Sequence, residues 1–548
     1  MIKKLWLLLV VSQITISTNF AQVASDPPFY KINVKIEPSS GTINCVTQIQ
    51  NPKDSCFVLN KDMEIKSIIA DGKPVSYEQK SSDFMQNASE VDINSPVPKN
   101  VIFEYSGKLN AESLPPIISS VNMINSKMVE LAFYVTWYPR AKNSNAFNFE
   151  LQLDIPSNFS AVTNASLENE KTENGRTITT WESFFPGADV AILAAPGLQK
   201  SIMEKNGTTV EIYYEKLSPA YIDSMKNNLI QSMEMLTNLY GPLKANSMIR
   251  VGYSPRGSWG YVRTPFIIVS EEKSLSWRSQ KFGPARDFRY LTHEIAHYWW
   301  LLANTGTPED WLNEGLAEFS AFYVSEKLIG KEFSEEILNE YKNRVDNSNS
   351  KLSIVETPSS SRDRELNRYD KPVIFFNEAM QRFGEQKLFA FLKSLYKRFS
   401  ESKNVNTDSF LDEAEKQLGP DAKQFFYESL HRTVWNTAKT NSEYLLIPAD
   451  SVFIGTWKGI MKIQGQELEV VLHLKNKDNK LFASLDSPAQ NVKDIPVAEA
   501  KLNGDAIALN IAVASAIYSG KIQKENLVIE GEWKQAGTVT SLILKKSE

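Results

Sequence analysis

The chain has 548 residues, of which 42% are hydrophobic and 23% charged, and its formal net charge is -5 at pH 7. This is the composition of an ordinary globular protein, and the length corresponds to three or four domains. The sequence contains neither a basic patch or tail nor an acidic block. These absences argue against a nucleic-acid-binding protein and against a disordered charged arm.

The first 21 residues predict a secretory signal peptide. Lys3 and Lys4 precede an apolar run from Leu5 to about Ile16, and the small residue Ala21 stands at the expected cleavage site. The run is too short for a membrane span, and no other segment reaches about 18 unbroken apolar residues. Neither cysteine lies at the end of the run, which argues against a lipoprotein anchor. We therefore expect an exported protein, periplasmic or extracellular, without a membrane span.

Residues 22–205 predict an antiparallel β domain. Apolar and polar side chains alternate in short runs, such as residues 30–36 and 147–153, and turn residues separate these runs. Cys45 and Cys56 flank a predicted turn between two strands. In an exported protein they either close a hairpin disulfide or remain two free buried thiols.

Residues 206–445 predict a mainly helical domain that carries the chemistry. It begins with strands at 210–214 and 248–253 on either side of a helix at 219–240, and further helices follow to about residue 430. Residues 358–362, of sequence Pro-Ser-Ser-Ser-Arg, predict a loop between two of these helices.

The segment His293-Glu294-Ile295-Ala296-His297 is the most informative part of this domain. On a helix, His293 and His297 lie one turn apart on the same face, where two imidazole nitrogens can bind one zinc ion. Glu294 is offset by one residue, so its carboxylate can reach a water bound to the metal but cannot easily be a third ligand. Apolar residues with helical spacing point almost oppositely: Phe288, Leu291, Ile295, Trp299 and Leu302.

Glu314 is the best-placed candidate for the third metal ligand. Thr307 to Asp310 predicts the start of a second helix, with proline at its first position and acids in its first turn, and Gly330 predicts its end. Two histidines and one glutamate leave a fourth position open for water, which is typical of a catalytic zinc site. Gly315 costs this helix about 1 kcal/mol relative to alanine and therefore indicates a steric need.

These residues resemble the signature of the M1 family of zinc aminopeptidases, within the gluzincin clan: His293-Glu294-x-x-His297 followed by Trp311-Leu312-Asn313-Glu314-Gly315. The resemblance implies a multidomain α+β fold, with an antiparallel β domain before a thermolysin-like, mainly helical catalytic domain. It also implies that Glu314 is the third ligand and Glu294 the general base. The family usually has two more residues between the second histidine and the liganding glutamate. Glu318, one turn later, is read either as a carboxylate that orients a ligand histidine or as a solvated charge.

A second part of the resemblance is the segment Arg368-Tyr369-Asp370-Lys371-Pro372, which is similar to the Tyr-x-Lys-Gly segment of the family. By this resemblance, Tyr369 donates a hydrogen bond to the tetrahedral intermediate. A phenol suits this role because it is a neutral donor where an oxyanion develops. Pro372 stands where the family usually has glycine.

A third part of the family pattern has no match. M1 aminopeptidases carry a Gly-x-Met-Glu-Asn loop whose glutamate holds the free amino group of the substrate, and the corresponding stretch here runs from Gly260 to Pro265. Arg263 stands at the position of that glutamate, and a guanidinium repels an ammonium group instead of accepting its hydrogen bonds. Gly260 and Arg263 are therefore candidates for substrate binding with altered specificity. In the other interpretations, another acid holds the amino group or Arg263 points to solvent.

Residues 446–548 return to a β pattern and predict a small barrel or sandwich. The opening Gly455-Thr456-Trp457 is lipocalin-like and similar to β modules fused to secreted bacterial hydrolases, with a role in binding or as a spacer. His473 in this module and His431 before it have no ligand-type neighbours in sequence and are interpreted as structural. M1 aminopeptidases usually close their active site with a large helical C-terminal domain. We therefore expect a more open cleft here that admits longer peptides.

The sequence thus predicts a secreted zinc metallopeptidase of the M1 aminopeptidase type, with one zinc ion and a peptide or protein as its substrate. One alternative is an endopeptidase or a carboxylate-reading peptidase on the same fold. Another is a catalytically silent relative that binds peptides or glycans. The sequence indicates no nucleic-acid partner and no particular oligomeric state.

Overall fold

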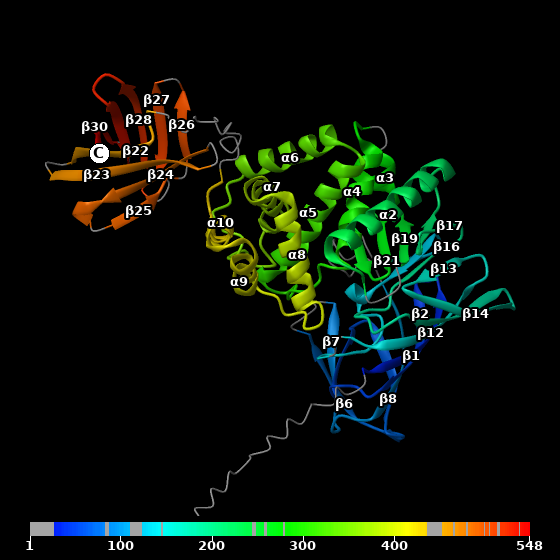
Figure 1. Ribbon diagram of the computed structural model, residues 1–548. Helices are drawn as coiled ribbons and strands as arrows, with labels where there is room; N and C mark the ends of the chain where they lie inside the picture. Colours follow the sequence, from blue (N-terminus) through cyan, green and yellow to red (C-terminus); the bar gives the residue numbers. More distant parts are fainter. Residues whose placement is uncertain are drawn as a thin grey trace, which may run out of the picture. The chain divides into compact units, whose positions relative to one another are not determined.

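The computed structural model describes residues 27–547 except 83–86, 110–122, 144–145, 244–247, 257–259, 278–279, 436–451, 464–465, 478–479, 491, 498, 504, 512–513, 515 and 536–537. The predicted signal peptide, residues 1–21, lies outside the described residues. The chain separates into two compact units, Met1–Val434 and Trp435–Glu548 (Figure 1). The first unit contains both the predicted N-terminal β domain and the predicted zinc domain.

An eight-stranded sheet forms the largest part of the N-terminal region. Its neighbouring strands are antiparallel except β1 and β12, which are parallel. The strands, in spatial order, are β14 (Ala165–Glu173), β15 (Arg176–Ser183), β12 (Asn148–Pro156), β1 (Phe29–Glu37), β2 (Thr42–Gln50), β8 (Asn100–Lys108), β4 (Met63–Ala70) and β5 (Lys73–Pro74). Because side chains alternate along each strand, every second residue of β1 points into a core: Tyr30, Ile32, Val34 and Ile36 are buried.

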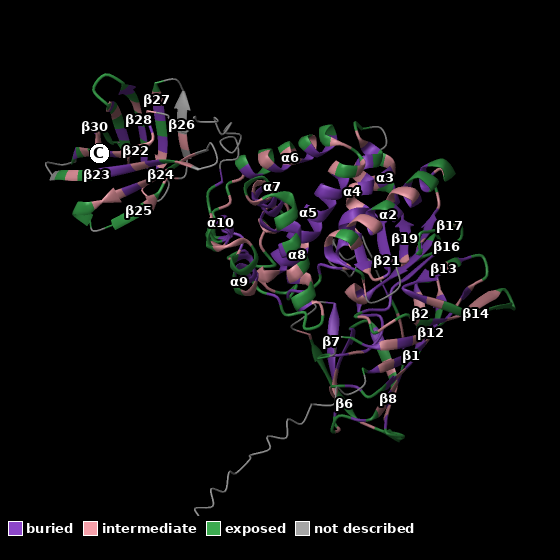
Figure 2. Cartoon of the chain, viewed as in Figure 1, coloured by how far each residue is buried: buried purple, intermediate pink, exposed green. Residues whose placement is uncertain are grey.

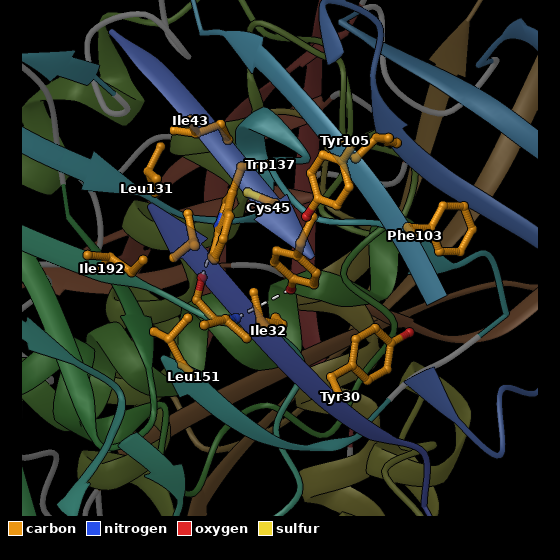
Figure 3. Packing of buried hydrophobic residues seen from close by; sticks show 14 of the residues in the cluster. Tyr30, Ile32, Ile43, Cys45, Phe103, Tyr105, Leu131, Trp137, Leu151 and Ile192 are labelled. Atoms are coloured by element: carbon orange, nitrogen blue, oxygen red, sulfur yellow. Dashed lines mark hydrogen bonds between the residues drawn. The ribbon is translucent and has the colours of Figure 1, made fainter. Parts of the chain in front are cut away.

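Two four-stranded sheets complete this region. One has the order β13 (Ser160–Thr163), β16 (Ile192–Ala195), β10 (Met128–Leu131) and β9 (Met123–Asn125), and the other β11 (Arg140–Ala141), β3 (Cys56–Asn60), β7 (Ala88–Ile93) and β6 (Tyr77–Ser81). Apolar side chains from all three sheets pack into one cluster, in which Trp137 is fully buried (Figure 3). The predicted β domain is therefore held by a continuous hydrophobic core.

The two cysteines are free thiols. Cys45 lies in β2 within the hydrophobic cluster (Figure 3), whereas half-buried Cys56 begins β3, a strand of a different sheet. β2 and β3 do not pair as a hairpin, so the hairpin disulfide considered from the sequence is wrong. The alternative of two free thiols is confirmed, although only Cys45 is fully buried.

A five-stranded mixed sheet opens the zinc domain. Its order is β17 (Gln199–Lys205), β18 (Thr208–Tyr214), β19 (Met248–Ser254), β21 (Phe266–Ser270) and β20 (Tyr261–Arg263). The predicted strands at 210–214 and 248–253 are β18 and β19, and the predicted helix at 219–240 is α2 (Pro219–Tyr240). The predicted domain boundary at 205/206 falls between β17 and β18, which form an antiparallel pair. The first strand of this sheet thus precedes that boundary.

Helices make up the remainder of the first unit (Figures 1 and 2). They are α3 (Glu271–Trp277), α4 (Gly283–Ala296), α5 (Trp311–Leu328), α6 (Lys331–Asp346), α7 (Lys371–Phe383), α8 (Glu385–Phe399), α9 (Thr407–Leu418) and α10 (Pro420–His431). A 3-10 turn (Pro308–Asp310) precedes α5, and a π turn (Leu366–Asp370) precedes α7. α5 is buried along most of its length, and it packs against α4, α6, α7 and the π turn. It is therefore the central helix of the domain.

The second unit is one antiparallel sheet of nine strands. They are, in spatial order, β25 (Val492–Pro496), β24 (Lys480–Ser487), β23 (Gln466–Lys477), β22 (Gly455–Ile463), β30 (Thr538–Ser547), β29 (Val528–Gln535), β28 (Ala516–Gln523), β27 (Ala506–Ile511) and β26 (Glu499–Asn503). The sheet curls around a hydrophobic core that includes Trp457 and Trp533 (Figure 1). A single curled sheet favours the predicted barrel over the predicted sandwich.

The predicted fold class is confirmed: the chain is multidomain α+β, with N-terminal β sheets, a mainly helical central domain and a C-terminal curled sheet. Among the described helices, none combines the length and the apolar character that a membrane crossing requires.

Candidate active site

Three side-chain atoms converge where the end of α4 meets the first turn of α5. His293 Nε2 and His297 Nε2 are 3.1 Å apart, and each lies 3.4 Å from Glu314 Oε2. Both histidines are buried, and the Glu314 side chain is 16% exposed. The structure therefore places the three predicted metal ligands around a common point.

This geometry fits a zinc ion. Nitrogen and oxygen ligands bind zinc at about 2.0–2.2 Å, and in a tetrahedral arrangement such ligand atoms are about 3.3–3.6 Å apart. The three separations between His293, His297 and Glu314 match this spacing to within about 0.2 Å. The side chains need no rearrangement to accept the ion.

Hydrogen bonding at the far side of His297 leaves the correct ring nitrogen free for metal. Its Nδ1 donates to the backbone carbonyl of Trp300 over 3.1 Å, so Nε2 has no proton in the neutral ring. The contact depends on α4 ending at Ala296, whereas the helical spacing of Trp299 and Leu302 predicted a longer helix. The chain turns at 297–299, and the His297 N–H still bonds to the His293 carbonyl, which preserves the spacing of the two rings.

His293 is held from its other side by Glu318, one turn after Glu314 on α5. Its Nδ1 forms an ion pair of 2.6 Å with Glu318 Oε2, and Arg289 and the Tyr341 hydroxyl donate to the other Glu318 oxygen. Burial favours protonation of Glu318, but Arg289 and His293 outweigh it and hold the pKa of this carboxyl well below its usual range. The structure thus places Glu318 where it orients a ligand histidine.

The carboxylates make this site favourable for a cation. Burial lowers the pKa of His293, but Glu314 and Glu318 outweigh that effect and raise the pKa to about 10. Burial likewise disfavours the charged form of Glu314, yet the two histidines lower its pKa well below the usual value. A buried position that stabilises positive charge so strongly is suited to a divalent ion.

Asn313 fixes the loop that joins the two zinc helices. Its Oδ1 accepts hydrogen bonds from the Leu302 and Ala303 backbone N–H groups, each of 2.9 Å. Its Nδ2 donates to the Ala303 carbonyl and to Asp310 Oδ1. All four contacts are buried within a short loop. Asn313 therefore sets how far Glu314 stands from the histidines, although the loop is shorter than in the family pattern.

Gly315 has the steric role that the sequence indicated. A Cβ at this position would lie 2.7 Å from Cβ and 2.8 Å from Cγ of Pro372, and 3.2 Å from the Arg368 carbonyl. α5 and the start of α7 are in such close contact that no larger residue fits. The missing side chain at Gly315 and the proline at 372 are thus complementary, and the contact holds the π turn against the helix that carries Glu314.

We predict that Gly315→Ala destabilises the protein by about 1–3 kcal/mol, the usual cost of overpacking. In an uncrowded helix the same change would stabilise by about 1 kcal/mol, so the sign of the effect reports the contact with Pro372. Thermal unfolding measures it, with Gly187→Ala as the control because nothing lies within 4 Å of the Cβ that it would add. A Gly315→Ala protein as stable as the wild type would contradict the close packing.

Tyr369 lies in the π turn beside the metal ligands. Its ring stacks on His293, with centroids 5.7 Å apart and planes inclined by 25°. Burial and the nearby Glu314 carboxylate raise the pKa of the phenol well above its usual value, so the hydroxyl stays protonated and can donate. π turns are common at functional sites because they move one side chain off the regular helical path.

Glu294 is buried on α4 between the two histidines. Burial raises the pKa of its carboxyl above the usual value, and the histidines act in the opposite direction. A carboxylate with a raised pKa is a better proton acceptor, which is the property that a general base requires.

Both predicted substrate-binding residues, Gly260 and Arg263, make contacts within the protein. Arg263 Nε donates to Asp189 over 2.5 Å, and its guanidinium lies over the rings of Tyr134 and Tyr261. The Gly260 N–H donates to the Tyr290 hydroxyl. The guanidinium of Arg263 therefore joins β20 to Asp189 of the N-terminal region and does not point freely to solvent. The side-chain exposure of Arg263 is 21%.

One of the interpretations from the sequence was that another acid holds the free amino group of the substrate. Glu130 on β10 lies nearby, with Tyr261 and Ser254 donating to its carboxylate. It is fully buried and forms an ion pair with Arg256 of 3.3 Å, so its charge is already compensated inside the protein.

The sequence did not reveal the roles of three arginines around the site. Arg368 is buried and donates to Asp310 and to the Thr307 carbonyl, and Arg364 approaches both Asp310 and Glu314. Arg289 precedes His293 by one helical turn and reaches Glu318. Helical spacing from His293 was a signal for Arg289, whereas the other contacts join residues at least 50 positions apart and left no local signal.

Residues 273–429 match the peptidase family M1 domain, a segment that contains all three candidate ligands, Glu294 and Tyr369 but not Arg263. These residues therefore form a domain of peptidase family M1. No curated protein sequence matches the chain.

Solved M1 structures share the fold. The M1 zinc metallopeptidase from Deinococcus radiodurans is 14% identical, with a TM-score of 0.59, and the match covers 75% of this chain and 94% of that one. Leukotriene A4 hydrolase from Saccharomyces cerevisiae is 13% identical, with a TM-score of 0.57, covering 76% and 70% of the two chains. The resemblance deduced from the sequence is therefore confirmed at the level of family and fold.

Proposed function

We propose that this M1 protein is a zinc-dependent peptidase of the aminopeptidase type that hydrolyses peptide bonds. The observation that carries the proposal is the triangle of His293, His297 and Glu314, whose atoms have the spacing that tetrahedral zinc requires. His293, His297 and Glu314 would hold one ion. When bound, zinc polarises a carbonyl and lowers the pKa of a water molecule, which makes that water a better nucleophile toward the carbonyl carbon.

Glu294 moves the protons in this mechanism. Its carboxylate accepts a proton from the attacking water and then passes it to the nitrogen of the leaving amine. Its burial supports this role, because a desolvated carboxylate holds a proton more strongly than an exposed one. The intact set of Glu294 and three ligands argues against a catalytically silent binding protein.

Tyr369 stabilises the oxygen that gains negative charge as the carbonyl becomes tetrahedral. Its hydroxyl is a neutral donor held beside His293, and its raised pKa keeps the proton in place. Such preorganised donors act most strongly where charge develops and water is excluded. Arg289, Glu318 and Tyr341 hold His293 in its orientation and do not themselves take part in proton transfer.

An endopeptidase is the second candidate, and the surroundings of Arg263 favour it. The position that carries an amine-binding glutamate in M1 aminopeptidases holds an arginine paired with Asp189, and the nearby Glu130 is paired with Arg256. Neither contact leaves an acid positioned to require a free amino terminus. A solved structure of the Deinococcus radiodurans enzyme holds a Tyr-Ser-Ala substrate, which supports short peptides as the first substrates to test.

Hydrolysis of a mixed peptide library tests the proposal, with each peptide supplied both free and N-terminally acetylated and the products read by mass spectrometry. Loss of single N-terminal residues from free peptides alone would support the aminopeptidase. Internal cuts in both forms would support the endopeptidase, and the absence of any cut in zinc-loaded protein would contradict a peptidase.

We also propose that the protein is exported. The charged start, apolar run and small residue at Ala21 within residues 1–21 support this proposal. N-terminal sequencing of the protein recovered from its native host tests it. A mature chain beginning at Gln22 supports export, and a chain that retains Met1 contradicts cleavage.

A further inference from the structure

Arg364 brings a positive charge to the candidate zinc site. Its Nη2 lies 3.5 Å from Glu314 Oε1 and 3.4 Å from Asp310 Oδ2. Its guanidinium carbon is 5.9 Å from the centre of the Tyr369 ring. The chain runs from Arg364 through the widened π turn to Tyr369, which brings the two side chains near each other. Arg364 therefore borders the place where substrate would react.

Neutralising Asp310 does not require Arg364. Arg368 already donates to Asp310, to the Thr307 carbonyl over 3.0 Å and to Ser359 Oγ over 2.9 Å. The Arg368 side chain is 1% exposed, whereas that of Arg364 is 35% exposed. The 3.4 Å contact between Arg364 and Asp310 is long for a charge-assisted hydrogen bond. Arg368 thus has the structural role, and Arg364 is only loosely held.

The guanidinium of Arg364 retains donors for another group. Within the part of the chain that the structure describes, both of its acidic contacts use Nη2. An arginine has five N–H donors in a planar fork, and two of them together match a carboxylate. By themselves, the acids Glu294, Glu314 and Asp310 would repel a substrate carboxylate. A partly exposed arginine among them offsets this repulsion and favours binding of the carboxylate.

We propose that Arg364 binds a carboxylate of the peptide substrate beside the scissile bond, so that the enzyme prefers peptides that carry one there. The proposal rests on the peptidase function proposed above. The carboxylate comes from the C-terminus of a short peptide or from an acidic side chain. Such a preference would make the protein a carboxylate-reading peptidase, one of the alternatives that the sequence left open.

Two series of peptide probes separate the two sources. The first compares di-, tri- and tetra-alanine with their C-terminal amides. The second uses amidated tetra-alanine in which one alanine after another is replaced by glutamate or by the neutral glutamine. For each pair, kcat/KM is measured with zinc-loaded full-length protein. We expect the carboxylate member to be preferred about tenfold in one series, as for a hydrogen-bonded ion pair.

Substitutions of Arg364 and of the nearby Arg362 test whether Arg364 is the residue that binds the carboxylate. Arg364→Met is expected to reduce the preference from about tenfold to about one, and Arg364→Lys to leave a smaller preference because it keeps the charge without the fork. Arg362→Met is the matched control, since Arg362 is exposed two residues earlier, and the preference should persist. Zinc content is measured for every variant. If Arg364→Met does not hold zinc, Arg364→Lys decides the result.

The outcomes separate this inference from the proposed function. A wild-type protein that cleaves no probe contradicts the peptidase itself. Cleavage without preference for either carboxylate overturns the inference and leaves the peptidase standing. An equal loss of kcat/KM on both members of each pair in the Arg364 variants also overturns it, because that result is expected if Arg364 only supports Glu314.

Discussion

Glu294→Gln is expected to lower kcat for peptide hydrolysis roughly 10²- to 10⁴-fold while zinc stays bound, because the amide cannot accept the proton that the carboxylate takes. The substitution keeps the size of the side chain, and Glu294 lies beside the ligands without being one of them. The measurement is kcat on a peptide that the wild type cleaves, together with the zinc content of the purified variant. Glu335→Gln, at an exposed position of α6, is the control.

The turnover and the zinc content of the Glu294→Gln protein together decide the role of Glu294. Lost turnover with one zinc ion per chain is the expected result for a general base. Lost turnover with lost zinc would show that Glu294 supports the metal site. Wild-type turnover in the Glu294→Gln protein would exclude the proposed role, and the proton acceptor would have to be sought elsewhere.

Tyr369→Phe is expected to lower kcat about 10²- to 10³-fold with little change in KM, the effect of removing one donor from a developing oxyanion. The ring would still stack on His293, so the variant removes only the hydroxyl. Steady-state kinetics on a single peptide measures both constants. Tyr77→Phe, at an exposed tyrosine of β6, is the control. A rise in KM at unchanged kcat would instead assign Tyr369 to substrate binding.

Local sequence was sufficient for the parts of the fold that local physics decides. Helix α2 begins and ends at Pro219 and Tyr240 as predicted, because Ser218 caps its first turn and proline occupies its first position. The strands at 210–214 and 248–253 were equally clear. The two histidine ligands followed from spacing, since histidines four residues apart share a helical face. Glu314 was assigned as the third ligand by the family resemblance.

Contacts between distant segments could not be predicted in the same way. Arg263 and Asp189 are 74 residues apart, and nothing in the sequence near either residue indicates their contact. In the loop that follows α4, the Leu302 and Ala303 backbone N–H groups donate to Asn313 on the next helix. Asn313 was visible in the family motif, but its contribution to the shape of the loop became clear only in three dimensions.

Zinc titration of chelator-stripped protein, with peptide hydrolysis followed at each addition, tests whether His293, His297 and Glu314 hold a catalytic ion. We expect stripping to abolish hydrolysis and activity to return in proportion to zinc until one ion is bound per chain. We also expect His297→Ala to regain no activity over the same range. Hydrolysis that survives complete removal of zinc, or full recovery by His297→Ala, would contradict the site built from His293, His297 and Glu314.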